Sequence, residues 1–197
     1  MKELLFATTN TGKVASLQRT FDRAGMAVKV VPKAFDLIEE QADDALQVAE
    51  SKARQAFALA GESLVVDDSA FHIPALGGFP GAYQKYVIDT IGPEGILKLM
   101  EGIEDRSAYF ISNLVYVDAT GKLASFSDSK YQGRVATAYN PAGKYEWGIT
   151  GKLFIPEGSD VVATELSLEE RYELGKQAGF EDAYELFVEW YMRHSDS

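Results

Sequence analysis

SLVVDDSAFHIPALGGFPGAYQK, residues 63–85, is the segment around which this chain is organised. It opens with the apolar run Leu64-Val65-Val66, which is long enough for a buried strand and too short for a helix. We predict that this strand ends at two adjacent carboxylates, Asp67 and Asp68. The paired glycines and the Pro-Gly that follow are typical of a tight loop in which backbone approaches a ligand closely, and Lys85 adds a cation after that loop.

The two carboxylates have two interpretations. Mg²⁺ is a hard ion that prefers oxygen ligands and often shares them with phosphates, so Asp67 and Asp68 are candidate metal ligands. Aspartates after a strand also cap turns, a role that requires no ligand. The segment alone leaves both interpretations open.

A polar loop near the N-terminus follows the apolar run 4–7 and precedes a helix with Val14, Leu17 and Phe21 on one face. A helix start after such a loop can present backbone N–H groups to an anion. The loop lacks the GxxxxGK spacing of a Walker A loop. An ordinary capped helix start explains the same residues, because Thr and Asn are good N-caps. The residues concerned are Thr8, Thr9, Asn10, Thr11, Gly12 and Lys13.

The remaining segments predict one α/β unit. Apolar and alternating runs indicate strands, with the fourth antiparallel to the third; in chain order they are 27–31, 64–66, 107–117, 122–132 and 153–158. An apolar stripe indicates a helix over 45–60, and a capping box indicates that a second helix starts at Ser167. A last helix carries an aromatic face over 180–191. We expect a mixed sheet that carries helices, with a long hairpin forming a second lobe.

Composition excludes several classes of protein. A chain of 197 residues, 46% of them hydrophobic, can bury a sizeable core, and its net charge of −11 disfavours binding to nucleic-acid backbone. The absence of Cys excludes thiolate chemistry, and the presence of only two His disfavours a histidine metal site and a Ser-His-Asp triad. No secretory or transmembrane segment is evident, so we expect a cytoplasmic protein without membrane or nucleic-acid partners.

Several stretches together resemble the inosine triphosphate pyrophosphatase family, the Ham1-like pyrophosphatases of non-canonical purine nucleoside triphosphates. Residues 8–13 look like the family's T-G-N-x-x-K, residues 66–69 its acidic-Asp-Ser/Thr element, and residues 75–85 its ALGGxPGxY segment with a following Lys. Further matches in order and spacing lie at 93–95, 103–109, 154–158 and 165–170. The likeness covers nearly the whole chain.

This resemblance implies a two-lobed α/β fold, with a mixed twisted sheet, flanking helices and a central substrate cleft, in a single domain over residues 1–197. It also implies a homodimer. Members of the family use Mg²⁺ to hydrolyse a nucleoside triphosphate to the monophosphate and diphosphate. That reaction requires positioned phosphates, neutralised charge and an activated water.

Site residues are carried over by matching motifs. The resemblance implies that the loop 8–13 cradles the triphosphate and that Lys52 and Lys85 bind substrate. Asp68 matches the acid assigned as general base and metal ligand, and Asp67 lies beside it as a further metal candidate. Glu39 stands where the family has a metal-binding Glu.

Two family elements that handle the base differ in this chain. The F-G-[YW]-D-P segment is replaced by residues 145–152, in which Trp147-Gly148 can stand for Phe-Gly but no Asp or Pro follows. The S-H-R element reads Gly175-Lys176-Gln177, and Arg171 stands where the family usually has Lys. Trp147 is a candidate to stack on a base, and Lys176 and Gln177 are candidates to hydrogen-bond it. Because paired polar groups set base specificity, these changes predict an altered base preference.

The leading hypothesis is therefore a Mg²⁺-dependent nucleoside triphosphate pyrophosphohydrolase whose preference differs from inosine or xanthosine. One alternative keeps the usual ITP, XTP and dITP substrates, with Lys176 and Gln177 substituting for the missing groups. Another is a nucleotide-binding protein without catalysis. The retained pair of aspartates and three lysines favours an enzyme.

Overall fold

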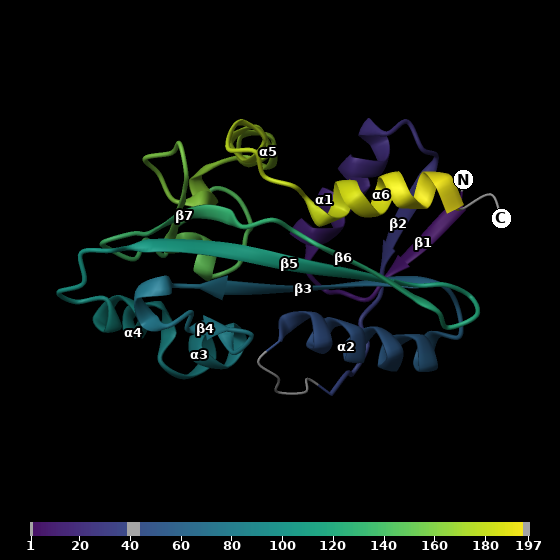
Figure 1. The fold of residues 1–197 in the computed structure, drawn as a ribbon, viewed down its shortest axis with the longest axis horizontal. Helices are drawn as coiled ribbons and strands as arrows, with labels where there is room; N and C mark the ends of the chain where they lie inside the picture. The colour runs from purple at the N-terminus through teal and green to yellow at the C-terminus, as the bar shows by residue number, and fades with distance from the viewer. Residues whose placement is uncertain (1, 39–43, 195–197) are drawn as a thin grey trace. The chain divides into compact units, whose positions relative to one another are not determined.

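The computed structural model describes residues 2–38 and 44–194 (Figure 1). Its strands are β1 (Lys2–Phe6), β2 (Val28–Pro32), β3 (Leu64–His72), β4 (Pro80–Gly81), β5 (Ser107–Val117), β6 (Leu123–Ser127), β7 (Tyr131–Val135) and β8 (Phe154–Pro156). Its α-helices are α1 (Thr11–Arg23), α2 (Ala45–Ala60), α3 (Gln84–Thr90), α4 (Gly92–Leu99), α5 (Leu168–Gln177) and α6 (Ala183–His194). Short 3-10 turns are η1 (Pro74–Leu76), η2 (Thr150–Lys152) and η3 (Ala163–Glu165).

The strands join into one sheet in the order β2-β1-β3-β5-β7-β8, with β4 paired to β3 and β6 paired to β5. Parallel pairs link β1 to β2 and β3, whereas β5, β6, β7 and β8 pair antiparallel. The sequence-based expectation of a mixed sheet with flanking helices is therefore confirmed.

The chain divides into two compact units. Unit 1 consists of Met1–Ser69, Ser112–Asp128 and Asp182–Ser197, and unit 2 consists of Ala70–Ile111 and Ser129–Glu181. The aspartate pair that follows Val66 belongs to unit 1, and the glycine loop after it belongs to unit 2.

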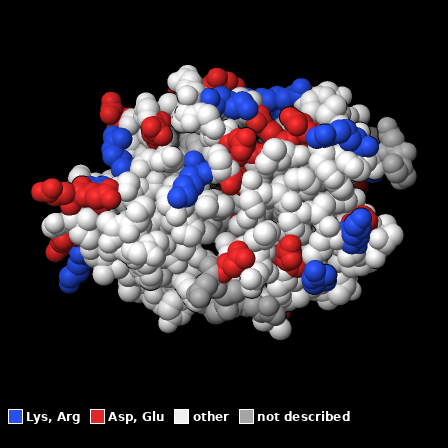
Figure 2. Space-filling view, in the orientation of Figure 1, with Lys and Arg blue, Asp and Glu red and all other residues white. Residues whose placement is uncertain are grey.

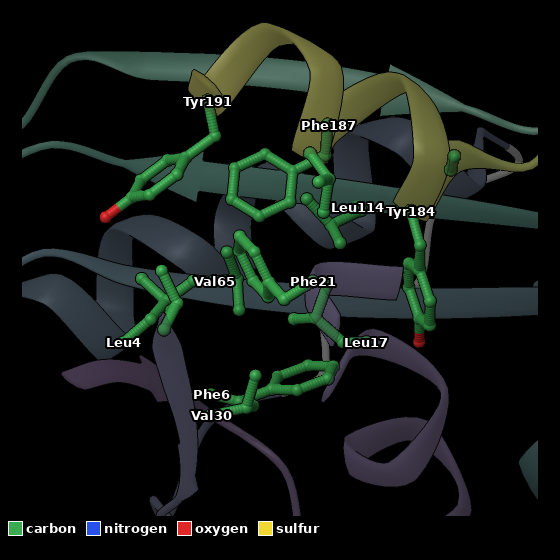
Figure 3. Close-up of a cluster of buried hydrophobic side chains, with 13 residues drawn as sticks. Leu4, Phe6, Leu17, Phe21, Val30, Val65, Leu114, Tyr184, Phe187 and Tyr191 are labelled. Carbon is green, nitrogen blue, oxygen red and sulfur yellow. The ribbon is translucent and has the colours of Figure 1, made fainter. Parts of the chain in front are cut away.

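Unit 1 has helices on both faces of its strands (Figure 1). On one face, α1 and α6 pack through an apolar cluster in which Phe21 and Phe187 make an edge-to-face contact and Val65 of β3 takes part (Figure 3). On the other face, α2 packs through a separate cluster that contains Ala49 and Val66. Neighbouring residues of β3 therefore point to opposite helices, as the alternation of a strand requires.

Unit 2 is built around an aromatic core. Phe71, Phe110 and Phe154 are buried, and Trp147 packs on Phe110 with ring centroids 5.2 Å apart. Edge-to-face and tilted arrangements of this kind are the favourable geometries for aromatic pairs. The core holds the paired strands β7 and β8 against the start of β5.

The predicted end of the central strand is wrong. β3 does not stop at Val66 but continues through both aspartates to His72. Its apolar pattern resumes at Ala70 and Phe71, which are fully buried, and Phe71 pairs with Gly81 of β4. The carboxylates interrupt the apolar run without ending the strand, because each of them has a basic partner within unit 1.

The predicted return strand 122–132 is also corrected, because it is divided into β6 and β7. The first residue after β6 is Asp128, and its carboxylate accepts two backbone N–H groups. Its Oδ2 accepts the backbone N–H of Ser112 at 2.9 Å, and its Oδ1 accepts that of Ala183 at the start of α6 at 2.6 Å. Asp128 thus attaches the C-terminal helix to the strands of unit 1.

The surface carries charges of both signs. On the face shown in Figure 2, Lys and Arg side chains are interspersed with Asp and Glu and do not form one basic patch. Within residues 2–38 and 44–194, no helix combines the length and apolar character needed to cross a membrane.

Candidate active site

The two central aspartates point to opposite faces of β3. Asp67 has the same parity as Val65 and contacts α1 and α6, whereas Asp68 has the parity of Val66 and contacts α2. Alternation along a strand makes this separation unavoidable. The structure therefore does not bring the two carboxylates together as ligands of one ion.

Asp67 lies beneath the start of α1 and holds Lys13. The Lys13 ammonium lies 3.3 Å from Asp67 Oδ2 and 3.2 Å from the Asp67 carbonyl oxygen. The Asp67 side chain is only 2% exposed, whereas that of Lys13 is 24% exposed. A buried carboxylate thus anchors a lysine whose ammonium remains accessible to solvent.

The loop before α1 is ordered by its own side chains. Asn10 Oδ1 accepts the backbone N–H groups of Gly12 at 2.9 Å and Lys13 at 3.1 Å, and Thr8 Oγ1 accepts the N–H of Asn10 at 3.1 Å. Asn10 is therefore the N-cap of α1, as its residue type suggests. Thr9 and Thr11 are exposed beside it. The capped helix start is present, and the exposed residues Thr9 and Thr11 lie within four residues of Lys13 in the chain.

Asp68 has its own basic partner on the opposite face. Lys52 of α2 places its ammonium 2.7 Å from Asp68 Oδ1. The two side chains are 15% and 17% exposed, so water reaches the pair. A positioned carboxylate that is accessible to water can accept a proton from it, which is the role that the family resemblance implies for Asp68.

Tyr184 is a site residue that the sequence analysis placed only on the aromatic face of the last predicted helix. Its hydroxyl donates to Asp67 Oδ2 at 2.5 Å. Burial, followed by the neighbouring Asp67 carboxylate, raises the pKa of the Tyr184 hydroxyl well above its usual range. One signal was available in the sequence, since a Tyr on an otherwise apolar helix face needs a partner for its hydroxyl.

Asp128 is a half-buried acid for which the sequence analysis gave no role. Burial, and then the charge of Asp182, raise the pKa of its carboxyl well above the ordinary value. Its two backbone donors at Ser112 and Ala183 give it a structural role at the start of α6.

The described residues contain no group of three or more His, Asp or Glu side chains arranged to hold a metal ion. Glu39, predicted as a metal ligand, lies outside the described residues. Mg²⁺ is often bound through one or two carboxylates, with substrate phosphates and water completing its shell. Asp68 fits that requirement, whereas Asp67 is committed to Lys13 and Tyr184.

Within unit 2, Lys85 lies on α3 with its side chain 73% exposed. Its ammonium pairs with Asp89 Oδ2 at 2.9 Å, one helical turn away. An exposed pair of this kind is weak, so a phosphate can displace the carboxylate.

The other candidate substrate-binding residues of unit 2, Arg171 among them, divide into buried and exposed groups. Arg171 is 9% exposed, donates to the carbonyl oxygens of Ala163 and Leu166, and lies 5.2 Å over the Trp147 ring. Arg171 therefore supports the ring of Trp147. Lys176 and Gln177 are exposed at the end of α5.

Gly175, at the position where the family resemblance implies the Ser of S-H-R, packs closely against the aromatic core of unit 2. A Cβ at this position would lie 3.1 Å from Tyr131 Cε2 and 3.3 Å from Phe180 Cδ1. Both distances are shorter than ordinary contact, so a side chain at this position requires Tyr131 and Phe180 to move by a few tenths of an ångström.

Apart from Tyr184, the site residues described above lie within a segment that matches a known protein family. The Ham1 family model matches residues 4–179. The chain is 40% identical over 189 residues to a dITP/XTP pyrophosphatase of Methanopyrus kandleri, covering 96% of each chain. It is 35% identical over 189 residues to a dITP/XTP pyrophosphatase of Pyrococcus horikoshii, covering 95% of this chain and 96% of that one.

Solved structures agree at the level of the fold. A HAM1 protein of Coxiella burnetii superposes with a TM-score of 0.76 at 22% identity, covering 98% of this chain and 100% of that one. Since the family match spans most of the chain and the sequence relatives align along nearly its full length, this protein belongs to the Ham1 family.

Proposed function

We propose that this protein is a nucleoside triphosphate pyrophosphatase, which hydrolyses its substrate to the monophosphate and diphosphate. The observation that carries the proposal is the Lys52–Asp68 pair at 2.7 Å, which provides a water-accessible carboxylate held by a cation. The anchored Lys13 and the exposed polar loop before α1 complete the set within unit 1. Relatives named dITP/XTP pyrophosphatases support the same activity.

Each residue has a role in this proposal. Asp68 orients a water molecule and accepts its proton as the water attacks. Lys52 holds the Asp68 carboxylate in place, and Lys13, Thr9 and Thr11 contact the phosphate oxygens. Positioned cations supply most of the assistance that phosphoryl transfer requires.

Magnesium fits this arrangement through Asp68, with Glu39 as a second candidate ligand. When bound, the ion would neutralise charge on the phosphates. We do not assign Asp67 to the metal, because its buried carboxylate already accepts from Tyr184 and pairs with Lys13.

For the base, the proposal takes the hypoxanthine and xanthine nucleotides as substrates. The relatives carry that substrate class in their names, so they favour the usual preference over the altered one that the missing Ser-His-Arg element predicts. Lys176 and Gln177 are exposed polar groups at the corresponding turn of α5 and can supply hydrogen bonds to a base.

An altered preference remains the second candidate, favoured by the commitment of Arg171 to the carbonyl oxygens of Ala163 and Leu166. That arrangement leaves the guanidinium as a support for Trp147. The two candidates predict different orders of substrate preference. Faster hydrolysis of dITP and XTP than of GTP and the pyrimidine triphosphates supports the first candidate, and any other order supports the second.

The test is a substrate screen with Mg²⁺ in which diphosphate and monophosphate are both quantified. We expect Asp68→Asn to lower kcat by about 100-fold or more while tripolyphosphate still binds, because a general base contributes about 10² to 10⁴ in rate. Failure to hydrolyse any nucleoside triphosphate would refute the proposal. Binding without turnover would indicate a nucleotide-binding protein, and release of orthophosphate alone would indicate a different hydrolase.

A further inference from the structure

Tyr184 lies in the first turn of α6, and that turn is held in place from two directions. Asp128 Oδ1 accepts the N–H of Ala183 at 2.6 Å, and Asp182 Oδ1 accepts the N–H of Tyr184 at 2.7 Å. Tyr184 as a whole residue is 7% exposed, and it packs in the cluster that joins α6 to α1. Figure 3 shows the ring extending from α6 beside Leu17, with the hydroxyl at the end away from the helix.

The Tyr184 hydroxyl donates to the Asp67 carboxylate, which also pairs with Lys13. Asp67 Oδ2 accepts from Tyr184 at 2.5 Å and pairs with the Lys13 ammonium at 3.3 Å. Asp67 Oδ1 has a much longer contact, 3.5 Å from Ser69 Oγ. One oxygen of a buried carboxylate is therefore shared between a neutral donor and a cation.

Because Asp67 Oδ2 is shared with Tyr184, it binds the Lys13 ammonium less tightly than an unshared oxygen would. A hydrogen bond to a charged group stabilises the charge by about 1.5–3 kcal/mol. With that donor in place, the carboxylate depends less on Lys13, and the ammonium can turn toward an anionic ligand at lower cost. Without the donor, Lys13 would be the main partner of a buried charge and would be held more tightly.

We propose that Tyr184 is a positioning residue for Lys13: by donating to Asp67 Oδ2, it keeps the lysine anchored yet available to a triphosphate. The inference rests on the proposed function in that Lys13 is taken to bind the triphosphate. Tyr184 itself touches no substrate. It extends the site from the N-terminal loop to the C-terminal helix within unit 1.

The test compares wild type, Tyr184→Phe, Asp67→Asn and the double variant. The dissociation constant of inorganic tripolyphosphate is measured by calorimetry, and KM and kcat are measured with dITP. We expect Tyr184→Phe to raise the dissociation constant and KM by about tenfold, with kcat within about twofold, since tenfold corresponds to the weaker end of a charged hydrogen bond. In the Asp67→Asn background, the same substitution should change neither constant by more than about twofold, because the charge through which Tyr184 acts is gone.

Tyr191→Phe is the matched control. It removes a hydroxyl from another buried ring of α6, and Tyr191 packs in the same apolar cluster. We expect it to leave the affinity for tripolyphosphate unchanged. If Tyr184→Phe does not fold, Asp67→Asn alone still decides the matter: loss of the competing charge should tighten tripolyphosphate binding by about threefold, and weaker binding would overturn the inference.

Other outcomes are equally decisive. An equal effect of Tyr184→Phe in both backgrounds, an unchanged affinity in both, or a loss confined to kcat would each refute a role through Asp67. Wild-type protein that binds tripolyphosphate but hydrolyses no nucleotide would refute the proposed function and leave the Tyr184 inference to be judged on binding. Wild-type protein that does not bind tripolyphosphate would overturn the inference.

Discussion

Replacing Gly175 with Ser adds a Cβ and a hydroxyl to the buried face of α5, restoring the residue type that the inosine triphosphate pyrophosphatase family has at this position. The new Cβ would lie 3.1 Å from Tyr131 Cε2 and 3.3 Å from Phe180 Cδ1. Tyr131 cannot move freely, because its hydroxyl donates to the Arg171 carbonyl oxygen at 3.0 Å. The ring contacts must therefore open by a few tenths of an ångström, or α5 must shift outward.

Two terms of opposite sign set the magnitude. Overpacking a tight interior site costs about 1–3 kcal/mol. A serine in a helix interior is favoured over glycine by about 0.5 kcal/mol. We therefore expect Gly175→Ser to lower the free energy of unfolding by about 1 kcal/mol.

Urea unfolding followed by circular dichroism measures this quantity, provided that the m value is unchanged. Gln177→Ser, two residues along the same helix and exposed, is the control and should stay within about 0.5 kcal/mol of wild type. A Gly175→Ser protein as stable as wild type, or more stable, would show that α5 has room for a side chain and that the close approach is not the reason for the glycine.

Three further predictions concern the core, the pH response and the ion pair. Phe187→Ala should lower stability by about 3–5 kcal/mol in urea unfolding, because a fully buried ring is lost. Burial raises the pKa of Tyr131 to about 12. The folded protein therefore keeps a Tyr131 proton that the unfolded chain loses from about pH 10, so Tyr131 should contribute a loss of about 2–3 kcal/mol of stability between pH 10 and 12, and Tyr131→Phe should make the fall with pH shallower. Lys52→Met leaves Asp68 without its cation and should cost about 2 kcal/mol, between the values for exposed and buried pairs, together with a marked loss of kcat; retention of full kcat would exclude a role for the pair in catalysis.

Much of the fold could be predicted from the sequence, because local signals coincide with the tertiary structure. The apolar stripe over 45–60 predicts α2 with its observed bounds, and the capping box at Ser167 is present at the start of α5. The long strand 107–117 is confirmed as β5. These segments have strong periodicity or a capping residue that depends only on neighbours in the chain.

The errors arise where a distant residue determines the local structure. The end of β3 could not be recognised, since Asp67 and Asp68 are tolerated in a strand only because Lys13 and Lys52 arrive from two helices. The division of the return strand depends likewise on Asp128 and its donor at Ala183. No spacing within either segment indicates such partners.

The alternation of β3 also changes what the acidic pair can do. Adjacent aspartates suggest a joint task when they are thought to follow a strand, because a turn can gather both carboxylates at one point. Inside a strand they must separate, and here one faces Lys13 and Tyr184 while the other faces Lys52. We infer a division of labour in which the buried Asp67 sets the position of a phosphate-binding lysine and the accessible Asp68 handles the proton. Asp67→Asn should consequently change the affinity for the triphosphate, and Asp68→Asn should lower turnover. If Asp67→Asn changed only turnover and Asp68→Asn changed only affinity in the same assay, the division would be refuted.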